Sequence, residues 1–147
     1  MLKKIDTVLA ALGNIRAMER LHVDTYTENL IENIPGDLIA ESREGQLFVG
    51  VQELNGYYFL EATIVSNVGI KTYKGGNLCF AGGTSDFDIK SDTQEIKSEY
   101  SNVSRRYMTD ISFEVSPHEI QRIVKGDFME VTFSFKKKSL LFQKREM

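Results

Sequence analysis

The stretch Gln46–Ile64, QLFVGVQELNGYYFLEATI, decides the fold of this chain. Asn55 and Gly56 stand at its centre, and both accept positive φ angles, so they favour a two-residue β-hairpin loop. A loop of this length fixes the register of the two flanking strands. The resulting cross-strand pairs are apolar: Leu47 with Ile64, Val49 with Ala62, Val51 with Leu60, and Leu54 with Tyr57. We therefore expect antiparallel sheet from residue 46 onward.

The chain beyond this hairpin keeps the alternation of apolar and polar residues that strands show. The segment 75–77, Gly-Gly-Asn, separates Gly69–Lys74 from Leu78–Ala81, which predicts a second hairpin. Residues 84–104 are more polar, and they predict a solvent-exposed edge hairpin that turns at residues 91–92. Both hairpins would extend the same sheet.

A strand followed by a short helix is predicted next. Residues 105–115 alternate regularly, which is typical of a half-buried strand. Ser116 to Glu119 then have the S-x-x-E spacing of a capping box, with proline at the first helical position. An apolar stripe and Gly126 follow, so we expect a helix at 117–125. The sequence leaves open a parallel crossover through this helix, because the connection between the flanking strands is just long enough.

The C-terminal residues predict one more hairpin, with its turn at 136–139. Apolar residues alternate before and after this turn. The register that pairs apolar groups inside and opposite charges outside has these partners: Phe135 with Leu140, Phe133 with Phe142, and Glu130 with Arg145.

The N-terminal third of the chain is helical and acidic in character. Lys3–Arg20 has apolar residues at spacings of three and four, which predicts an amphipathic N-terminal helix. Residues 24–45 contain six acidic side chains and one basic side chain, with a helical turn expected at Glu28–Asn33. The sequence leaves the structure of residues 37–45 unassigned. We expect residues 1–45 to pack on the sheet as one segment, because an isolated helix of this length is marginal in water.

Together these features predict an α+β fold. We expect a single curved, mainly antiparallel sheet of about six to eight strands, with the N-terminal amphipathic helix and the short helix near 117–125. The length of 147 residues is the usual size of one domain, so residues 1–147 are expected to form a single domain with a sheet-rich body at 46–147.

Composition excludes several classes of protein. The net charge is −3 and 41% of residues are hydrophobic, but no run approaches the roughly 20 apolar residues that span a bilayer. We expect a cytoplasmic location.

The single cysteine, Cys79, excludes an intramolecular disulfide and any CxxC site. No cofactor or metal is expected, because the glycine pairs lack phosphate-loop spacing, and Asp86, Asp88 and Asp92 lack the EF-hand glycine.

Local signatures of catalysis are missing from the sequence. No GxSxG motif occurs; Cys79 is expected to be a small core side chain, and His118 to face solvent in the first helical turn. We interpret the chain as a non-catalytic interaction or ligand-binding module, whose partner is a protein or a small ligand. A small enzyme with a carboxylate-based site is an alternative, since paired carboxylates need no sequence spacing. A homo-oligomer is left open.

Charge is distributed unevenly, and the C-terminal part is basic. Lys136, Lys137 and Lys138 are expected at a hairpin tip, with support from Lys144 and Arg145, and they are the candidate binding residues. A second alternative is therefore a peripheral protein that binds anionic membrane surfaces without spanning them. The net negative charge of the whole chain argues against nucleic acid as a partner.

Overall fold

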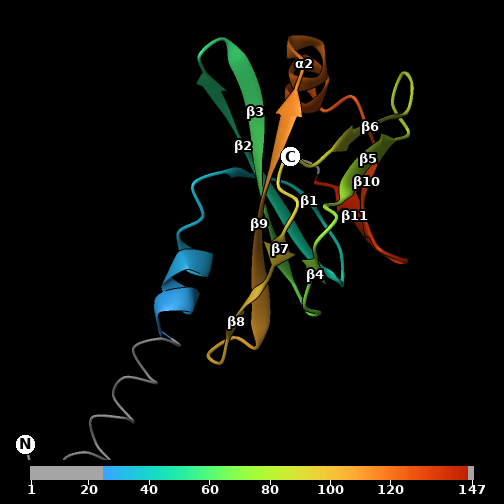
Figure 1. Ribbon diagram of the computed structural model, residues 1–147. Helices are drawn as coiled ribbons and strands as arrows, with labels where there is room; N and C mark the ends of the chain where they lie inside the picture. Colours follow the sequence, from blue (N-terminus) through green and yellow to red (C-terminus); the bar gives the residue numbers. More distant parts are fainter. Residues whose placement is uncertain (1–24, 146–147) are drawn as a thin grey trace, which may run out of the picture.

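A computed structural model describes residues 25–145 of the chain (Figure 1). The amphipathic helix that the sequence predicts at Lys3–Arg20 lies outside these residues. The described part begins with a helix at 25–32, which covers all but the last residue of the helical turn expected at Glu28–Asn33. Eleven strands and a second helix, α2 (Pro117–Lys125), follow.

Nine strands form one antiparallel sheet in the order β6-β5-β10-β11-β1-β2-β3-β9-β8, and β4 and β7 form a separate two-stranded sheet. The α+β fold with a curved antiparallel sheet is confirmed, but the sheet is larger than the six to eight strands expected. The strands are β1 (Asp37–Glu41), β2 (Gly45–Leu54), β3 (Tyr57–Ser66), β4 (Lys71–Thr72), β5 (Asn77–Ala81), β6 (Phe87–Lys90), β7 (Ile96–Lys97), β8 (Glu99–Ser101), β9 (Arg106–Val115), β10 (Glu130–Phe135) and β11 (Lys138–Lys144).

The curvature of the sheet brings its two end regions together around the core. Ser91, directly after β6, forms an isolated antiparallel bridge with Phe113 of β9. The Asp92 amide also donates to the Ser112 carbonyl at 2.7 Å. The concave side of the sheet is therefore enclosed, and its largest fully buried side chains are aromatic: Phe80, Phe113, Phe133 and Phe142.

The β2–β3 hairpin has the register that the sequence predicts. Leu54 pairs with Tyr57 and Leu47 with Ile64, so the prediction is confirmed along the hairpin. Asn55 has a φ of 54° and Gly56 a φ of 84°, which is the left-handed geometry that this tight loop requires. β1, in the region that the sequence leaves unassigned, pairs with β2 and begins opposite Val49.

The two hairpins predicted between residues 69 and 104 are wrong. β4 pairs with β7, whereas β5 lies between β10 and β6. The amide of Gly75 donates to the Gln94 carbonyl at 2.8 Å, and that of Gly76 donates to Ser91 Oγ at 2.9 Å. The glycine pair therefore contacts the segment after β6 instead of closing a turn between β4 and β5. The expected edge position is right in one respect, since β6 and β8 end the strand order.

The C-terminal hairpin forms, but its predicted register is wrong by two residues. Phe135 pairs with Lys138 and Phe133 with Leu140, while Glu130 lies opposite Gln143 instead of Arg145. Lys136 adopts a φ of 53°, so residues 136–137 alone make the turn. A shift by two keeps every side chain on the same face, which is why alternation could not distinguish the two registers. The parallel crossover is also wrong, because β9 and β10 are not neighbours.

Helix α2 confirms the predicted boundaries. The Ser116 hydroxyl accepts a hydrogen bond from the Glu119 amide, and the Glu119 carboxylate accepts one from the Ser116 amide. Gly126 ends the helix in the left-handed conformation with a φ of 73°.

The helix at 25–32 packs through Ile31 against Val65 and Met108 on the other side of the sheet. No helix among residues 25–145 is long and apolar enough to cross a bilayer.

Candidate ligand-binding cavity

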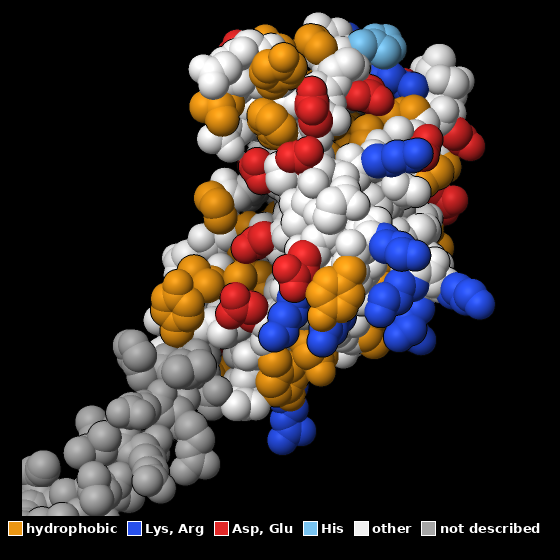
Figure 2. All heavy atoms as spheres, viewed as in Figure 1, with side chains coloured by type: hydrophobic (Ala, Val, Ile, Leu, Met, Phe, Trp, Pro, Cys, Tyr) orange, Lys and Arg blue, Asp and Glu red, His pale blue; other side chains and the backbone are white. Residues whose placement is uncertain are grey.

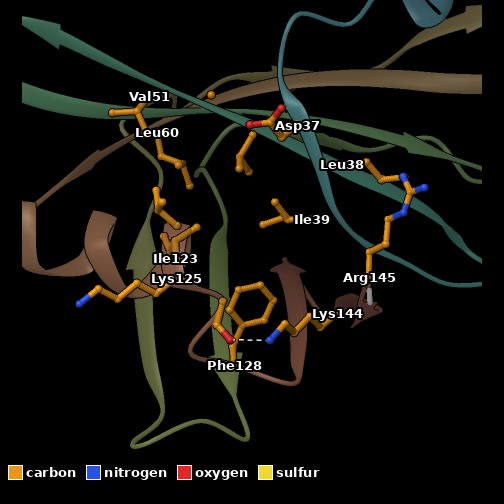
Figure 3. Close-up of a pocket in the computed structure, with 14 residues that line it drawn as sticks. Asp37, Leu38, Ile39, Val51, Leu60, Ile123, Lys125, Phe128, Lys144 and Arg145 are labelled. Carbon is orange, nitrogen blue, oxygen red and sulfur yellow. Dashed lines mark hydrogen bonds between the residues drawn. The ribbon is translucent and has the colours of Figure 1, made fainter. Parts of the chain in front are cut away.

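A cavity of about 680 Å³ lies between helix α2 and strands β1, β2 and β11 (Figure 3). Its position follows from strand length. β1 begins opposite Val49, so Val51 and the rest of the β2–β3 hairpin extend beyond it without a β1 partner. Helix α2 lies across the space that remains. The lining is mostly apolar: Leu38, Ile39, Val49, Gly50, Val51, Leu60, Ile123, Val124, Gly126 and Phe128, with Asp37, Lys125, Lys144 and Arg145.

The floor of the cavity belongs to the hydrophobic core. Leu60 of β3 is fully buried, and Ile123 of α2 and Phe128 are each 3% exposed. The Phe128 ring meets the Phe80 ring edge to face, with centroids 5.2 Å apart. These contacts fix the floor through side chains from three separate parts of the chain. The cavity is therefore a feature of the packed fold and does not depend on a loop closing over it.

The mouth of the cavity combines exposed apolar residues with charge. Val51 is 48% exposed and Val124 is 71% exposed, so apolar surface reaches the solvent on both sides. Figure 3 shows apolar side chains in the middle of the cavity and ionisable ones around its edge. Three of the four ionisable residues that line it are cations, which gives the rim a net positive charge.

Two of these cations come from the end of β11. Lys144 Nζ donates to the Gly126 carbonyl at 2.8 Å and lies 5.8 Å from the centre of the Phe128 ring. Its position at the C-terminal end of α2 is favourable, because helix carbonyls carry partial negative charge there. The backbone amide of Arg145 donates to the Ile39 carbonyl at 2.9 Å, which fixes the start of its side chain beside β1.

The polar contacts of Arg122 with Asp127 and Ser85, called the brace below, connect α2 to the rest of the fold. Arg122 Nε forms an ion pair of 2.9 Å with Asp127, and its other nitrogens donate to the hydroxyl and carbonyl of Ser85. The guanidinium also lies 4.3 Å from the centre of the Phe87 ring. The Thr84 amide, together with Arg122, holds the pKa of the Asp127 carboxyl below its ordinary value. The brace joins the C-terminal turn of α2 to the loop between β5 and β6.

The candidate residues that the sequence indicated lie at the other end of the sheet. Lys136 and Lys137 form the β10–β11 turn and Lys138 begins β11, and all three are exposed. Lys144 and Arg145 lie at the opposite end of β11 and line the cavity, so they do not support the lysine tip as expected. The structure places this predicted group at the two opposite ends of β11.

Cys79 and His118, which the sequence offers as reactive residues, do not line this cavity. Cys79 is half-buried on β5. The pKa of its thiol is raised, mainly by burial and also by the negative charge of Asp88. His118 is exposed in the first turn of α2, as the sequence predicts. No group of three or more His, Cys, Asp or Glu residues within 25–145 is arranged to hold a metal ion.

The sequence signals for the cavity are weak. Ile123 and Val51 were predicted on apolar faces, but an apolar face indicates a core position and does not show where the core is left hollow. Asp37 and Ile39 lie in a segment whose structure the sequence left unassigned. A mismatch in length between β1 and β2 would have been the informative signal, and it required the start of β1 to be known.

Comparisons with known proteins identify no relative. A scan against protein-family models, a search of curated proteins and a search of solved structures each return no match. One architecture hosts many unrelated activities, so the fold does not define a function by itself. The geometry and chemistry of the cavity therefore carry the functional proposal.

Proposed function

We propose that this protein is a non-catalytic binding module for a small amphipathic molecule with an apolar body and an anionic end. The observation that carries this proposal is the cavity beneath α2, where an apolar floor lies inside a rim with three cations and one carboxylate. A ligand of this class would place its body against Leu60 and Phe128, and its charged end towards the rim.

The size and lining of the cavity support a small ligand. Ligand pockets have volumes of about 300–1,000 Å³ and are lined mainly by apolar side chains with a few polar groups. The volume of about 680 Å³ lies within this range. An apolar ligand body would gain roughly 25 cal/mol for each Å² removed from water. The roughly 8 kcal/mol of micromolar binding therefore requires about 330 Å² of buried apolar surface, which calls for a long alkyl chain.

The charges at the rim support an anionic end group. Lys144 Nζ has three donor hydrogens, and the structure uses one of them on the Gly126 carbonyl. Lys125 and Arg145 add two further cations around the same opening, whereas Asp37 is the one acidic residue in the lining. A carboxylate end group suits this rim, because hydrogen bonds between a cation and a carboxylate are stronger than neutral ones.

The alternative of a small carboxylate-based enzyme receives less support from this cavity. Acid–base catalysis by paired carboxylates requires two such groups on either side of a substrate. The residues that line the cavity provide one, Asp37, so the lining is better suited to holding a ligand than to transferring protons within it.

The test is calorimetric titration of the full chain with dodecanoate and with dodecanol, which share a chain length and differ in charge. We expect micromolar binding of dodecanoate and at least tenfold weaker binding of dodecanol, because the neutral alcohol makes no ion pair at the rim. Failure of both ligands to bind would contradict the proposal. Tighter binding of dodecanol would contradict the anionic end group.

A matched pair of variants locates the ligand. Val51→Trp places a large side chain at the mouth of the cavity and should weaken dodecanoate binding at least tenfold. Val68→Trp is the control, because Val68 lies outside the cavity and is 49% exposed, almost the same as Val51 at 48%. Equal affinities for the two variants would place the ligand elsewhere.

A further inference from the structure

We propose that the end of the sheet opposite α2 is a docking surface for an anionic lipid bilayer. This surface, the basic end, consists of the predicted lysine tip, Lys136–Lys138, together with Lys71, Lys74, Lys90 and Lys97. All seven side chains are exposed. Figure 2 shows Lys and Arg side chains gathered on one part of the molecular surface, over the region where Figure 1 places β4 and β11.

Strand pairing brings these lysines to one end although they come from distant segments. Lys71 of β4 lies directly opposite Lys97 of β7. Lys90 ends β6 opposite Asn77, and Asn77 in turn lies opposite Ser134, two residues before the lysine tip. Lys74 precedes the Gly75–Gly76 pair, which contacts the segment that follows Lys90. Three separate parts of the chain therefore contribute charge to the same end: the lysine tip, the β4–β7 ribbon and the end of β6.

The charge of the basic end is uncompensated by ion pairs. Among the described residues the ion pairs are Arg106 with Glu28 and Arg122 with Asp127, and neither involves the basic end. Residues 25–145 contain fourteen Lys and Arg and seventeen Asp and Glu, so the rest of the described chain holds seven cations and seventeen acids. Half of the described cations therefore belong to the basic end, and an anionic plane would orient the molecule with this end inward.

The Lys71–Lys97 pair is an arrangement that stability alone does not favour. Like charges directly opposite each other on neighbouring strands repel and destabilise the pairing. An anionic partner removes this repulsion, so the pair is better suited to the bound state than to the free protein. Lys71 Nζ also lies 5.9 Å from the centre of the Tyr73 ring, which is 61% exposed within the basic end. Such an amphipathic ring is favoured at the headgroup level of a bilayer.

The shape of the surface favours a bilayer over nucleic acid. The lysines lie on the lysine tip, on the β4–β7 ribbon and at the end of β6, so they are spread over three separate parts of the chain. Single-stranded nucleic acid is bound along a basic groove with several stacking aromatic side chains. A bilayer presents a plane of phosphate and carboxylate headgroups, which separate projecting lysines contact at the same time.

The test is co-sedimentation of the full chain with sucrose-loaded vesicles of phosphatidylcholine containing about 30% phosphatidylserine, at about 0.1 M salt. Each lysine close to an anionic surface strengthens binding roughly fivefold. We therefore expect at least tenfold weaker partitioning for Lys136→Gln/Lys137→Gln/Lys138→Gln. The same loss is expected for Lys71→Gln/Lys74→Gln/Lys97→Gln, which leaves the lysine tip intact.

The control is Gln52→Glu/His118→Glu/Gln121→Glu, which lowers the net charge by the same amount at exposed positions near the α2 end. Its partitioning should stay within about twofold of the parent, because these residues lie far from the bilayer. Equal binding to pure phosphatidylcholine vesicles, no binding to either vesicle, or an unaffected Lys71/Lys74/Lys97 variant would overturn the proposal. Displacement of the protein from vesicles by equimolar poly(U) would overturn it in favour of single-stranded RNA.

Discussion

The two ends of the sheet differ in how deeply their inward-facing apolar side chains are buried. At the basic end the inward-facing row continues through Phe133 and Phe135, which are 0% and 4% exposed. At the α2 end the corresponding row on β2 runs from Val49, at 7% exposure, to Val51, at 48%. Apolar residues occupy these inward-facing positions in both places. The difference shows that alternation sets the direction of a side chain, whereas the neighbouring strands decide whether the space is filled.

The neighbouring strands differ in length at the two ends. β10 has a partner on each side, β5 and β11, along Val131 to Ser134. β2 loses β1 as a partner beyond Val49 and continues to Leu54 with β3 alone. The interior is consequently packed beside the lysine tip and hollow beneath α2. We propose accordingly that the hollow end takes a ligand inside and that the basic end contacts a charged plane.

The largest expected effect is a loss of stability at the packed end. Phe133→Ala should lower the free energy of unfolding by about 3–5 kcal/mol, because a fully buried aromatic side chain leaves a cavity that the neighbours do not fill. Val51→Ala, at the hollow end, should cost less than about 1 kcal/mol, since Val51 is 48% exposed. Urea unfolding measures both changes. Similar losses for the two variants would contradict the contrast between a packed and a hollow end.

The sequence was sufficient for those elements whose local signals agree with the tertiary pairing. Asn55 and Gly56 define both the loop and the register of β2 and β3, and Ser116 with Glu119 defines the start of α2. The predicted register of β10 and β11 was wrong because Lys136 adopts a left-handed conformation, which is uncommon for lysine. Two registers with the same inward faces were then indistinguishable.

The candidate site was less predictable than the fold. The lysine tip is visible as three consecutive residues, but Lys71 and Lys97 join it only through the β4–β7 pairing, which the sequence did not indicate. The cavity depends on β1, α2 and the end of β11, which are brought together by strand order and by the length of β1. These are properties of the assembled sheet, and no single segment contains them.

The brace can be removed without changing any residue that lines the cavity. Arg122→Ala removes the ion pair with Asp127, the hydrogen bonds to Ser85 and the contact with Phe87. We expect a loss of about 2 kcal/mol in the free energy of unfolding, and weaker dodecanoate binding because α2 is no longer held over the cavity. Arg43→Ala, at an exposed position in the β1–β2 turn, is the control. Unchanged dodecanoate affinity would show that the brace does not position the cavity.

The smallest expected effect concerns acid sensitivity, and it tests a third region, where the helix at 25–32 meets the sheet. Glu28 is 8% exposed, and its carboxylate accepts a hydrogen bond of 2.7 Å from the Ser101 hydroxyl. The Ser104 and Ser101 hydroxyls, and also the Arg106 guanidinium, hold the pKa of Glu28 below its ordinary value. A lowered pKa means that the charged form is stabilised by folding.

This contribution is therefore present at neutral pH, and it is lost as the pH falls below the ordinary glutamate range towards the lowered pKa of Glu28. Glu28→Gln should remove up to about 1 kcal/mol of the difference in unfolding free energy between pH 7 and pH 3. Glu53→Gln removes the same charge from an exposed position on β2 and is the matched control. Urea unfolding at the two pH values measures the difference. If Glu28→Gln and Glu53→Gln retained the same pH dependence, the acid sensitivity would not arise where the helix at 25–32 meets the sheet.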